Sequence, residues 1–170
     1  MRNIVIYGFM GTGKSLIGRM IATHYGMDFI EMDDQIEQEE ALSISAIFAE
    51  KGEDYFRLCE RNLVKKLAKK ENTVISTGGG VVLNKENISD FAKGGVGICL
   101  WARPEVILKR TKKGNKRPLL LVKNPIEEIN RLLKQRDPYY KVVTHHVDTS
   151  LATPQEVVEK IKNILEKESI

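Results

Sequence analysis

The segment GFMGTGKS, residues 8–15, decides the fold that this sequence predicts. It matches GxxxxGK[ST], the pattern of a loop that binds the phosphates of a nucleotide. The apolar run NIVIY at 3–7 precedes it and is typical of a buried strand, whereas LIGRMIATHYG at 16–26 follows it and is typical of a helix that ends at Gly26. This loop requires a strand before it and a helix after it, so the segment predicts nucleotide binding in an α/β fold.

Each residue type in this segment has a physical reason for its place. Glycines allow backbone N–H groups to point inward at a large anion, and the following helix presents its positive end to the same point. The ammonium of Lys14 can reach the β and γ oxygens of the nucleotide, and the hydroxyl of Ser15 can bind Mg²⁺. The loop does not identify the phosphate acceptor, because GTPases, motor ATPases and small-molecule kinases share it.

The composition is that of one globular domain over residues 1–170, with 42% hydrophobic residues and a net charge of +4. This mild charge suits an anionic small molecule and, without a basic and aromatic surface motif, does not indicate nucleic acid. No apolar run approaches the roughly 20 residues that cross a membrane, and the N-terminus lacks a signal-peptide cleavage site. Cys59 and Cys99 lie far apart and are expected to be buried thiols in a reducing compartment. We therefore expect a cytoplasmic protein that binds neither a membrane nor nucleic acid.

Short apolar strands alternate with amphipathic helices along the whole chain. The expected strands are 3–7, 27–32, 72–77, 95–101 and 144–150. The expected helices cover 13 or 14 to 25, 43–52 with Ser43 as N-cap, 53–70, a stretch that begins at Pro104, 124–136 with Asn124 as N-cap, and 153–168. This alternation predicts a parallel sheet covered by helices on both faces.

The segment KRTKKGNKRPLLLVK at 109–123 interrupts this pattern with seven basic residues and no acidic one. A run of charge is ordinarily a solvated loop. Because this run lies between two helices in a chain with a phosphate-binding motif, we expect a mobile basic lid over an anionic ligand.

Several classes that share the phosphate loop do not fit the rest of the chain. A GTPase needs an NKxD-type guanine motif, and VKNP at 122–125 lacks the aspartate. A motor ATPase usually has acids at the end of an apolar strand, where VISTGGG at 74–80 has glycines. A small-molecule kinase fits best. A gluconate-type or nucleotide kinase and a catalytically silent nucleotide-binding partner protein are the alternatives.

Motifs along nearly the whole length resemble those of the shikimate kinase family. They are GFMGTGKSLIGR at 8–19, DDQIEQ at 33–38, SISAIFAEKGEDYFRLCE at 43–60, STGGGVV at 76–82, RPLL at 117–120 and RDPYY at 136–140. The resemblance implies a P-loop NTPase fold, a three-layer α/β/α sandwich around a five-stranded parallel sheet, with substrate-binding helices at about 31–61 and the lid at 109–123. It also implies a monomer that uses Mg²⁺ and transfers the γ-phosphoryl group of ATP to the 3-hydroxyl of shikimate. The products would be ADP and shikimate 3-phosphate, in chorismate and aromatic amino acid biosynthesis.

The resemblance assigns roles to individual residues. Arg57 and Arg136 correspond to the arginines that bind the substrate carboxylate, which a planar guanidinium can hold by two parallel hydrogen bonds. Asp33 corresponds to the acid that grips the ring hydroxyls and accepts the proton of the attacking one. The implied catalytic residues are Lys14, Asp33 and Arg117, and the implied substrate loop is Gly78, Gly79 and Gly80. The implied ATP contacts are Gly11, Thr12, Gly13, Lys14, Ser15, Leu16, Arg110, Arg117 and Pro154. Taken without the resemblance, Arg57 would be expected to pair with Glu53 or Glu60 on the surface, and Arg136 with Asp137.

One stretch departs from the family pattern. The family has D-x-D where this chain has EMDD at 31–34, which places Glu31 at the position that assists Mg²⁺ through water. Glutamate is one methylene longer than aspartate, and Mg²⁺ tolerates displaced ligands poorly. Either Glu31 acts through an intervening water, or Ser15 and the phosphates hold the ion alone. A register in which Asp34 replaces Asp33 as the substrate acid is the other possibility.

Overall fold

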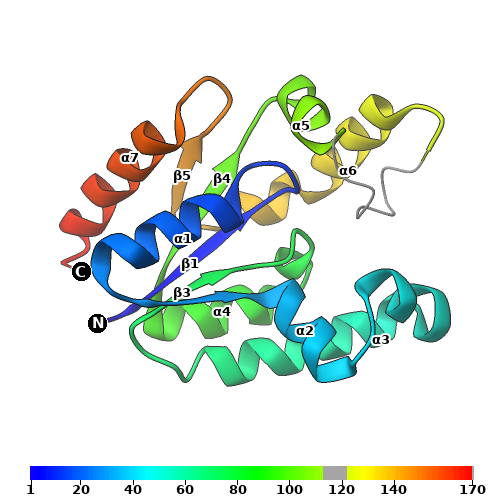
Figure 1. The fold of residues 1–170 in the computed structure, drawn as a ribbon, viewed down its shortest axis with the longest axis horizontal. Coiled ribbons are helices and arrows are strands. Elements are labelled where there is room, and N and C mark those ends of the chain that lie inside the picture. The colour runs from blue at the N-terminus through cyan, green and yellow to red at the C-terminus, as the bar shows by residue number, and fades with distance from the viewer. Residues whose placement is uncertain (113–121, 170) are drawn as a thin grey trace.

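The computed structural model describes residues 1–112 and 122–169, and Figure 1 shows their arrangement. Five parallel strands form one sheet in the order β2-β3-β1-β4-β5. They are β1 Asn3–Gly8, β2 Asp28–Glu31, β3 Thr73–Ser76, β4 Gly95–Trp101 and β5 His145–Asp148. All five expected strands are therefore confirmed: β2, β3 and β5 are shorter than expected, β4 has the expected bounds, and β1 extends one residue further.

Helices cover both faces of this sheet. On one face, α1 (Lys14–Tyr25) and α7 (Pro154–Lys167) pack against the strands, as Figure 1 shows. On the other face lie α3 (Ile44–Leu67), α4 (Lys85–Gly94) and α6 (Pro125–Tyr140). Three shorter elements complete the described chain: α2 (Met32–Glu40), η1 (Val81–Leu83) and α5 (Pro104–Thr111).

The central strand β1 is buried on both faces. Ile4 and Ile6 belong to the apolar cluster beneath α1 and α7, whereas Val5 and Tyr7 belong to the cluster beneath α3, α4 and α6. Because side chains alternate across a strand, an uninterrupted apolar run can serve two cores at once. This explains why NIVIY reads as a buried strand of a parallel sheet.

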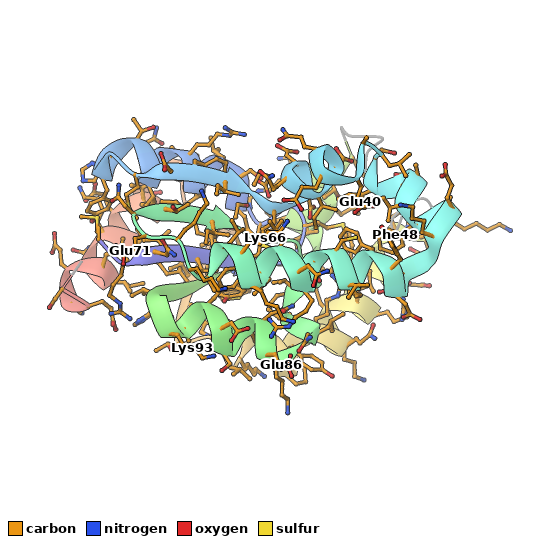
Figure 2. All side chains as sticks on the ribbon, turned by 90° about the horizontal axis from the view of Figure 1, so that it is seen from below. Glu40, Phe48, Lys66, Glu71, Glu86 and Lys93 are labelled. Atoms are coloured by element: carbon orange, nitrogen blue, oxygen red, sulfur yellow. The ribbon has the colours of Figure 1, made fainter. Side chains whose placement is uncertain are left out.

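Helix α3 corresponds to both of the helices that the sequence predicts separately, at 43–52 and 53–70. Gly52 interrupts it with φ 83° and ψ 170°, so the predicted boundary at this residue corresponds to a kink. In Figure 2, α3 lies between α2, which carries Glu40, and α4, which carries Glu86 and Lys93. Arg61 joins α3 to α4 through ion pairs with Asp90 at 2.7 Å and Glu86 at 3.1 Å.

Some helix predictions differ from the structure. Ser43 caps α3 as expected, because its side chain accepts a hydrogen bond from the Ala46 N–H at 3.2 Å. Asn124 precedes α6 but its side chain makes no capping hydrogen bond there. Helix α6 also continues past Arg136 and through Pro138 to Tyr140, whereas the prediction ended it at Arg136.

Two further predictions concern the burial of the cysteines and the segment that is expected to form a lid. Cys99 is buried, as predicted, and Cys59 is only partly buried. In the described ranges, no helix has both the length and the apolar character needed to cross a membrane. Residues 109–111 of the expected lid belong to α5, and 113–121, with Arg117, lie outside the described residues.

Candidate active site

The phosphate-binding loop lies between the end of β1 and the first turn of α1. Gly13 has φ 101° and directly precedes Lys14, the first residue of the helix. Such a positive φ is unfavourable for residues with a side chain, so glycine is required at this point. The Thr12 hydroxyl donates to the Phe9 carbonyl at 2.7 Å, and Lys14 Nζ donates to the same carbonyl at 3.1 Å. The loop is thus tied by its own side chains in front of the positive end of α1.

Arg110 connects this loop to the segment after β5. Its guanidinium donates to the carbonyl of Gly11 at 3.3 Å and to the hydroxyl and carbonyl of Thr149 at 3.0 and 2.7 Å. The Thr149 hydroxyl in turn donates to the Thr12 carbonyl at 3.0 Å. Pro154 begins α7 a few residues further on. Arg110 therefore lies beside the phosphate loop, and its role as an ATP contact stays a prediction.

The three glycines after β3 lie close to the residues that are predicted to bind the phosphoryl acceptor, here called the acceptor residues: Asp33, Arg57 and Arg136. A Cβ on Gly78 would lie 2.9 Å from Asp33 Oδ1, and a Cβ on Gly79 would lie 3.4 Å from Arg136 Nη1. A Cβ on Gly80 would lie 2.5 Å from both terminal nitrogens of Arg57. The distances at Gly78 and Gly80 are shorter than real Cβ contacts, so side chains there would displace Asp33 and Arg57, whereas the distance at Gly79 is an ordinary van der Waals contact. The absence of side chains on the loop allows one acid and two guanidiniums to converge there.

Gly79 also links this loop to the phosphate loop. The same Cβ on Gly79 would lie 3.5 Å from the Gly8 carbonyl and 3.6 Å from the Met10 nitrogen. The strands that precede the two loops, β1 and β3, are neighbours in the sheet. The acceptor residues and the phosphate loop therefore face each other at the carboxyl end of the sheet, where open α/β folds bind their ligands.

Arg57 is held by two carboxylates. Its Nη1 donates to Glu60 at 2.9 Å, while Nε and Nη2 donate to Glu53 at 3.3 and 3.1 Å. Burial alone would lower the pKa of Arg57, but Glu60 and Glu53 together raise it. Both partners are those expected of a surface arginine, yet the Arg57 side chain is only 26% exposed and contacts the glycine loop.

Glu60 is a buried acid that was not among the predicted site residues. Its side chain is 2% exposed, and Oε1, which would lie 2.9 Å from a Cβ on Gly78, has no hydrogen-bond partner among the described residues. Burial raises the pKa of Glu60 to about 7; Arg57 opposes this rise and Asp33 adds to it. A carboxylate three residues after an arginine on a helix ordinarily indicates a surface ion pair, so the sequence gives no clear sign of this burial.

This raised pKa predicts a pH-dependent stability. The folded state holds the Glu60 proton up to a pH of about 7, whereas an ordinary glutamate loses it near 4.5. The unfolding free energy of the protein should therefore fall as the pH rises between these values, by on the order of 2–3 kcal/mol, and level off above them. We expect Glu60→Gln to lack this fall. Urea unfolding of both proteins at pH 5 and pH 8 measures it, and an equal change in the two would contradict the prediction.

Arg136 is buried, with 5% of the residue exposed. Its guanidinium lies over the ring of Phe9, 5.5 Å from the ring centroid, and its Nε has no hydrogen-bond partner among the described residues. Asp137, the neighbour expected to pair with a surface arginine here, pairs instead with Lys141 at 2.6 Å. A buried guanidinium with an unused N–H is a favourable partner for a carboxylate ligand.

Tyr140 supports the glycine loop and was not predicted as a site residue. Its hydroxyl donates to the Gly79 carbonyl at 2.6 Å. Burial raises the pKa of this hydroxyl, which therefore remains a donor. Tyr140 ends the RDPYY motif that Arg136 begins, and the continuation of α6 through Pro138 places both side chains at this loop. The motif was the available signal, because the family pattern R-x-P-x-Y that it resembles has its tyrosine at Tyr140 and any residue at Tyr139.

Of the two adjacent acids Asp33 and Asp34, it is Asp33 that lies at the glycine loop. Asp33 Oδ1 lies near the backbone of Gly78, whereas Asp34 is exposed. Both residues lie in the first turn of α2, where the positive helix end favours carboxylates. Only Asp33 faces the glycine loop.

Glu31 lies at the end of β2 beside the phosphate loop. Burial raises the pKa of its carboxyl, while the nearby hydroxyls of Ser15 and Ser76 and the ammonium of Lys14 lower it. Its Oε2 has no hydrogen-bond partner within the described ranges. A buried carboxylate oxygen beside Ser15 fits the chemistry of Mg²⁺, which prefers oxygen ligands and water.

Comparison with known proteins gives one consistent answer. The family model described as "Shikimate kinase" matches residues 10–166. The shikimate kinase of Thermoanaerobacter pseudethanolicus is 48% identical over 161 residues, which are 95% of this chain and 94% of that protein.

Solved structures agree with this match. Shikimate kinase from Acinetobacter baumannii in complex with shikimate has a TM-score of 0.94 and 32% identity, covering 100% of this chain and 96% of that one. Shikimate kinase from Aquifex aeolicus has a TM-score of 0.86 and 36% identity, covering 99% and 98%. With the phosphate loop and the acceptor residues converging at one end of the same fold, the chain belongs to the shikimate kinase family.

Proposed function

We propose that this protein is an ATP-dependent shikimate kinase, which transfers the γ-phosphoryl group of ATP to the 3-hydroxyl of shikimate. The observation that carries the proposal is the glycine loop Gly78–Gly80, which lies against Asp33, Arg57 and Arg136 and also against the phosphate loop. Two guanidiniums suit the carboxylate of the acceptor, and one acid suits its hydroxyls. The membership of the family supports the same substrates. The pathway would be chorismate and aromatic amino acid biosynthesis.

The protein's own residues would perform most of the reaction by positioning and charge. Arg57 and Arg136 orient the acceptor so that its hydroxyl faces the terminal phosphorus in line with the leaving oxygen. Asp33 accepts the proton that this hydroxyl loses. Lys14, at the start of α1, stabilises the negative charge on the transferring group.

Ser15 would hold Mg²⁺ directly, and Glu31 would assist through water. When bound, the ion neutralises negative charge on the β- and γ-phosphates of ATP.

Arg117 is proposed as a further cation at these phosphates, and the 109–123 segment as the lid that excludes water. We expect Arg117→Ala to lower kcat more than it raises either KM. We also propose a cytoplasmic monomer.

The substrate is tested by a coupled assay of ADP release. We expect rapid, Mg²⁺-dependent release with shikimate and only background release with gluconate or AMP. Activity with gluconate or AMP instead would favour the alternative kinases, and no activity with any acceptor would favour a silent nucleotide-binding protein.

Arg136→Lys should weaken the binding of shikimate. Lysine keeps the positive charge but cannot form two parallel hydrogen bonds with a carboxylate. We expect the KM for shikimate to rise about tenfold or more, with a smaller change in kcat and no change in the KM for ATP. Steady-state kinetics with each substrate varied in turn would show this. A large loss in kcat with an unchanged KM for shikimate would contradict the role of Arg136.

A further inference from the structure

The contacts of Arg57 cover both edges of its guanidinium. Glu53 Oε1 accepts from Nε and Nη2 along the side edge, and Glu60 Oε2 accepts from Nη1. The end that carries Nη1 and Nη2 lies against Gly80, where a Cβ would be 2.5 Å from both nitrogens. These are the two edges on which a guanidinium holds a carboxylate by paired hydrogen bonds. An incoming carboxylate must therefore replace one of these neighbours.

The two acids differ in how easily they can leave. The Glu60 side chain is 2% exposed, whereas that of Glu53 is 60% exposed. An exposed ion pair contributes little to stability and exchanges readily with water, while breaking a buried pair leaves an uncompensated charge. Glu53 also follows Gly52, at which α3 departs from helical geometry. Glu53 is therefore the carboxylate that an incoming ligand can displace from Arg57.

We infer that Glu53 is an internal competitor for Arg57, and that its carboxylate occupies the edge which the carboxylate of the acceptor takes on binding. The inference rests on the proposed function, in which Arg57 binds that carboxylate. Binding then exchanges one carboxylate for another on the same guanidinium and releases Glu53 to solvent. The exchange weakens acceptor binding and raises the KM for shikimate. Because only an anion replaces the lost ion pair, it also disfavours acceptors without a carboxylate.

The variant Glu53→Gln tests this inference because it keeps the size of the side chain and removes its charge. We expect titration calorimetry to show shikimate binding on the order of two- to fivefold more tightly than to the parent protein. The KM for shikimate should fall by a similar factor, with a smaller change in kcat. If Glu53 only oriented Arg57 or supported α3, Glu53→Gln would instead weaken the binding of shikimate.

Asp54→Asn is the matched control. Asp54 is the next residue and is also exposed, so the substitution removes one negative charge from the same region without touching the Arg57 pair. We expect a clearly smaller change in affinity from this control. Equal effects of the two variants, or unchanged or weaker binding by Glu53→Gln, would overturn the inference and leave the proposed function standing. Failure of the parent protein to bind shikimate would overturn both.

Discussion

Replacing Lys14 with methionine is expected to lower kcat by a factor of about a hundred to a thousand. Lys14 begins α1, and its ammonium lies over the phosphate loop, where it donates to the Phe9 carbonyl at 3.1 Å. In the proposed reaction this ammonium is one of the few positive charges that face the transferring phosphoryl group. Removing one preorganised charge or donor at such a point costs about two to three powers of ten in rate. Methionine preserves the length and apolar stem of the side chain, so the loss reports the charge.

The loss of kcat should be specific to the substitution of Lys14. Lys65, an exposed lysine of α3, provides the control, and Lys65→Met should retain the kcat of the parent protein. Thermal unfolding of the Lys14 variant shows whether the fold is intact. A loss of less than tenfold in a folded Lys14→Met protein would contradict the assigned role.

Asp33→Asn is expected to lower kcat by about a hundredfold or more. Asp33 Oδ1 lies near Gly78 at the meeting point of the acceptor residues. Asparagine keeps the size of the side chain and one acceptor oxygen, but it replaces the other oxygen with an NH₂ donor and cannot accept a proton from the attacking hydroxyl. General base catalysis contributes typically two to four powers of ten, so most of the loss should appear in kcat.

The adjacent acid is the matched control for this prediction. Asp34 is exposed and lies in the same first turn of α2, so Asp34→Asn changes the local charge equally. We expect Asp34→Asn to retain nearly the full kcat. Equal, mild losses in the two variants would show that neither is the substrate acid, and a larger loss from Asp34→Asn would show that the alternative register is correct.

The strands and most helices were predictable because their sequences carry strong periodic patterns. The run NIVIY is buried on both sides because it supplies two cores. Helix α2 lies in the region where the resemblance implies substrate-binding helices, but the periodic pattern did not reveal it, because MDDQIEQEE buries only Met32 and Ile36. Helix α4 was missed for a similar reason, since its buried residues are Phe91 and the polar Asn87. In both helices the packing against α3 provides stability that local sequence does not reveal.

The candidate site was predictable where its residues belong to motifs with fixed spacing. The phosphate loop is contiguous in sequence, so Lys14 and Ser15 follow from the pattern itself. Arg57, Arg136 and Asp33 come from three distant segments, and only the resemblance to a family linked them before the structure did. Glu53 and Glu60 were expected only as surface partners of Arg57, and Tyr140 was only part of a motif, because the burial of Glu60 and the contact of Tyr140 with the glycine loop depend on the fold.

The identity of the phosphorylated product tests the central claim most directly. The protein is incubated with ATP, Mg²⁺ and shikimate, and the product is examined by phosphorus–proton correlation NMR. We predict one phosphate ester per ADP formed, with its phosphorus coupled to the proton on carbon 3 of the ring. Formation of ADP with free phosphate and unchanged shikimate, or coupling to another ring proton, would contradict the account.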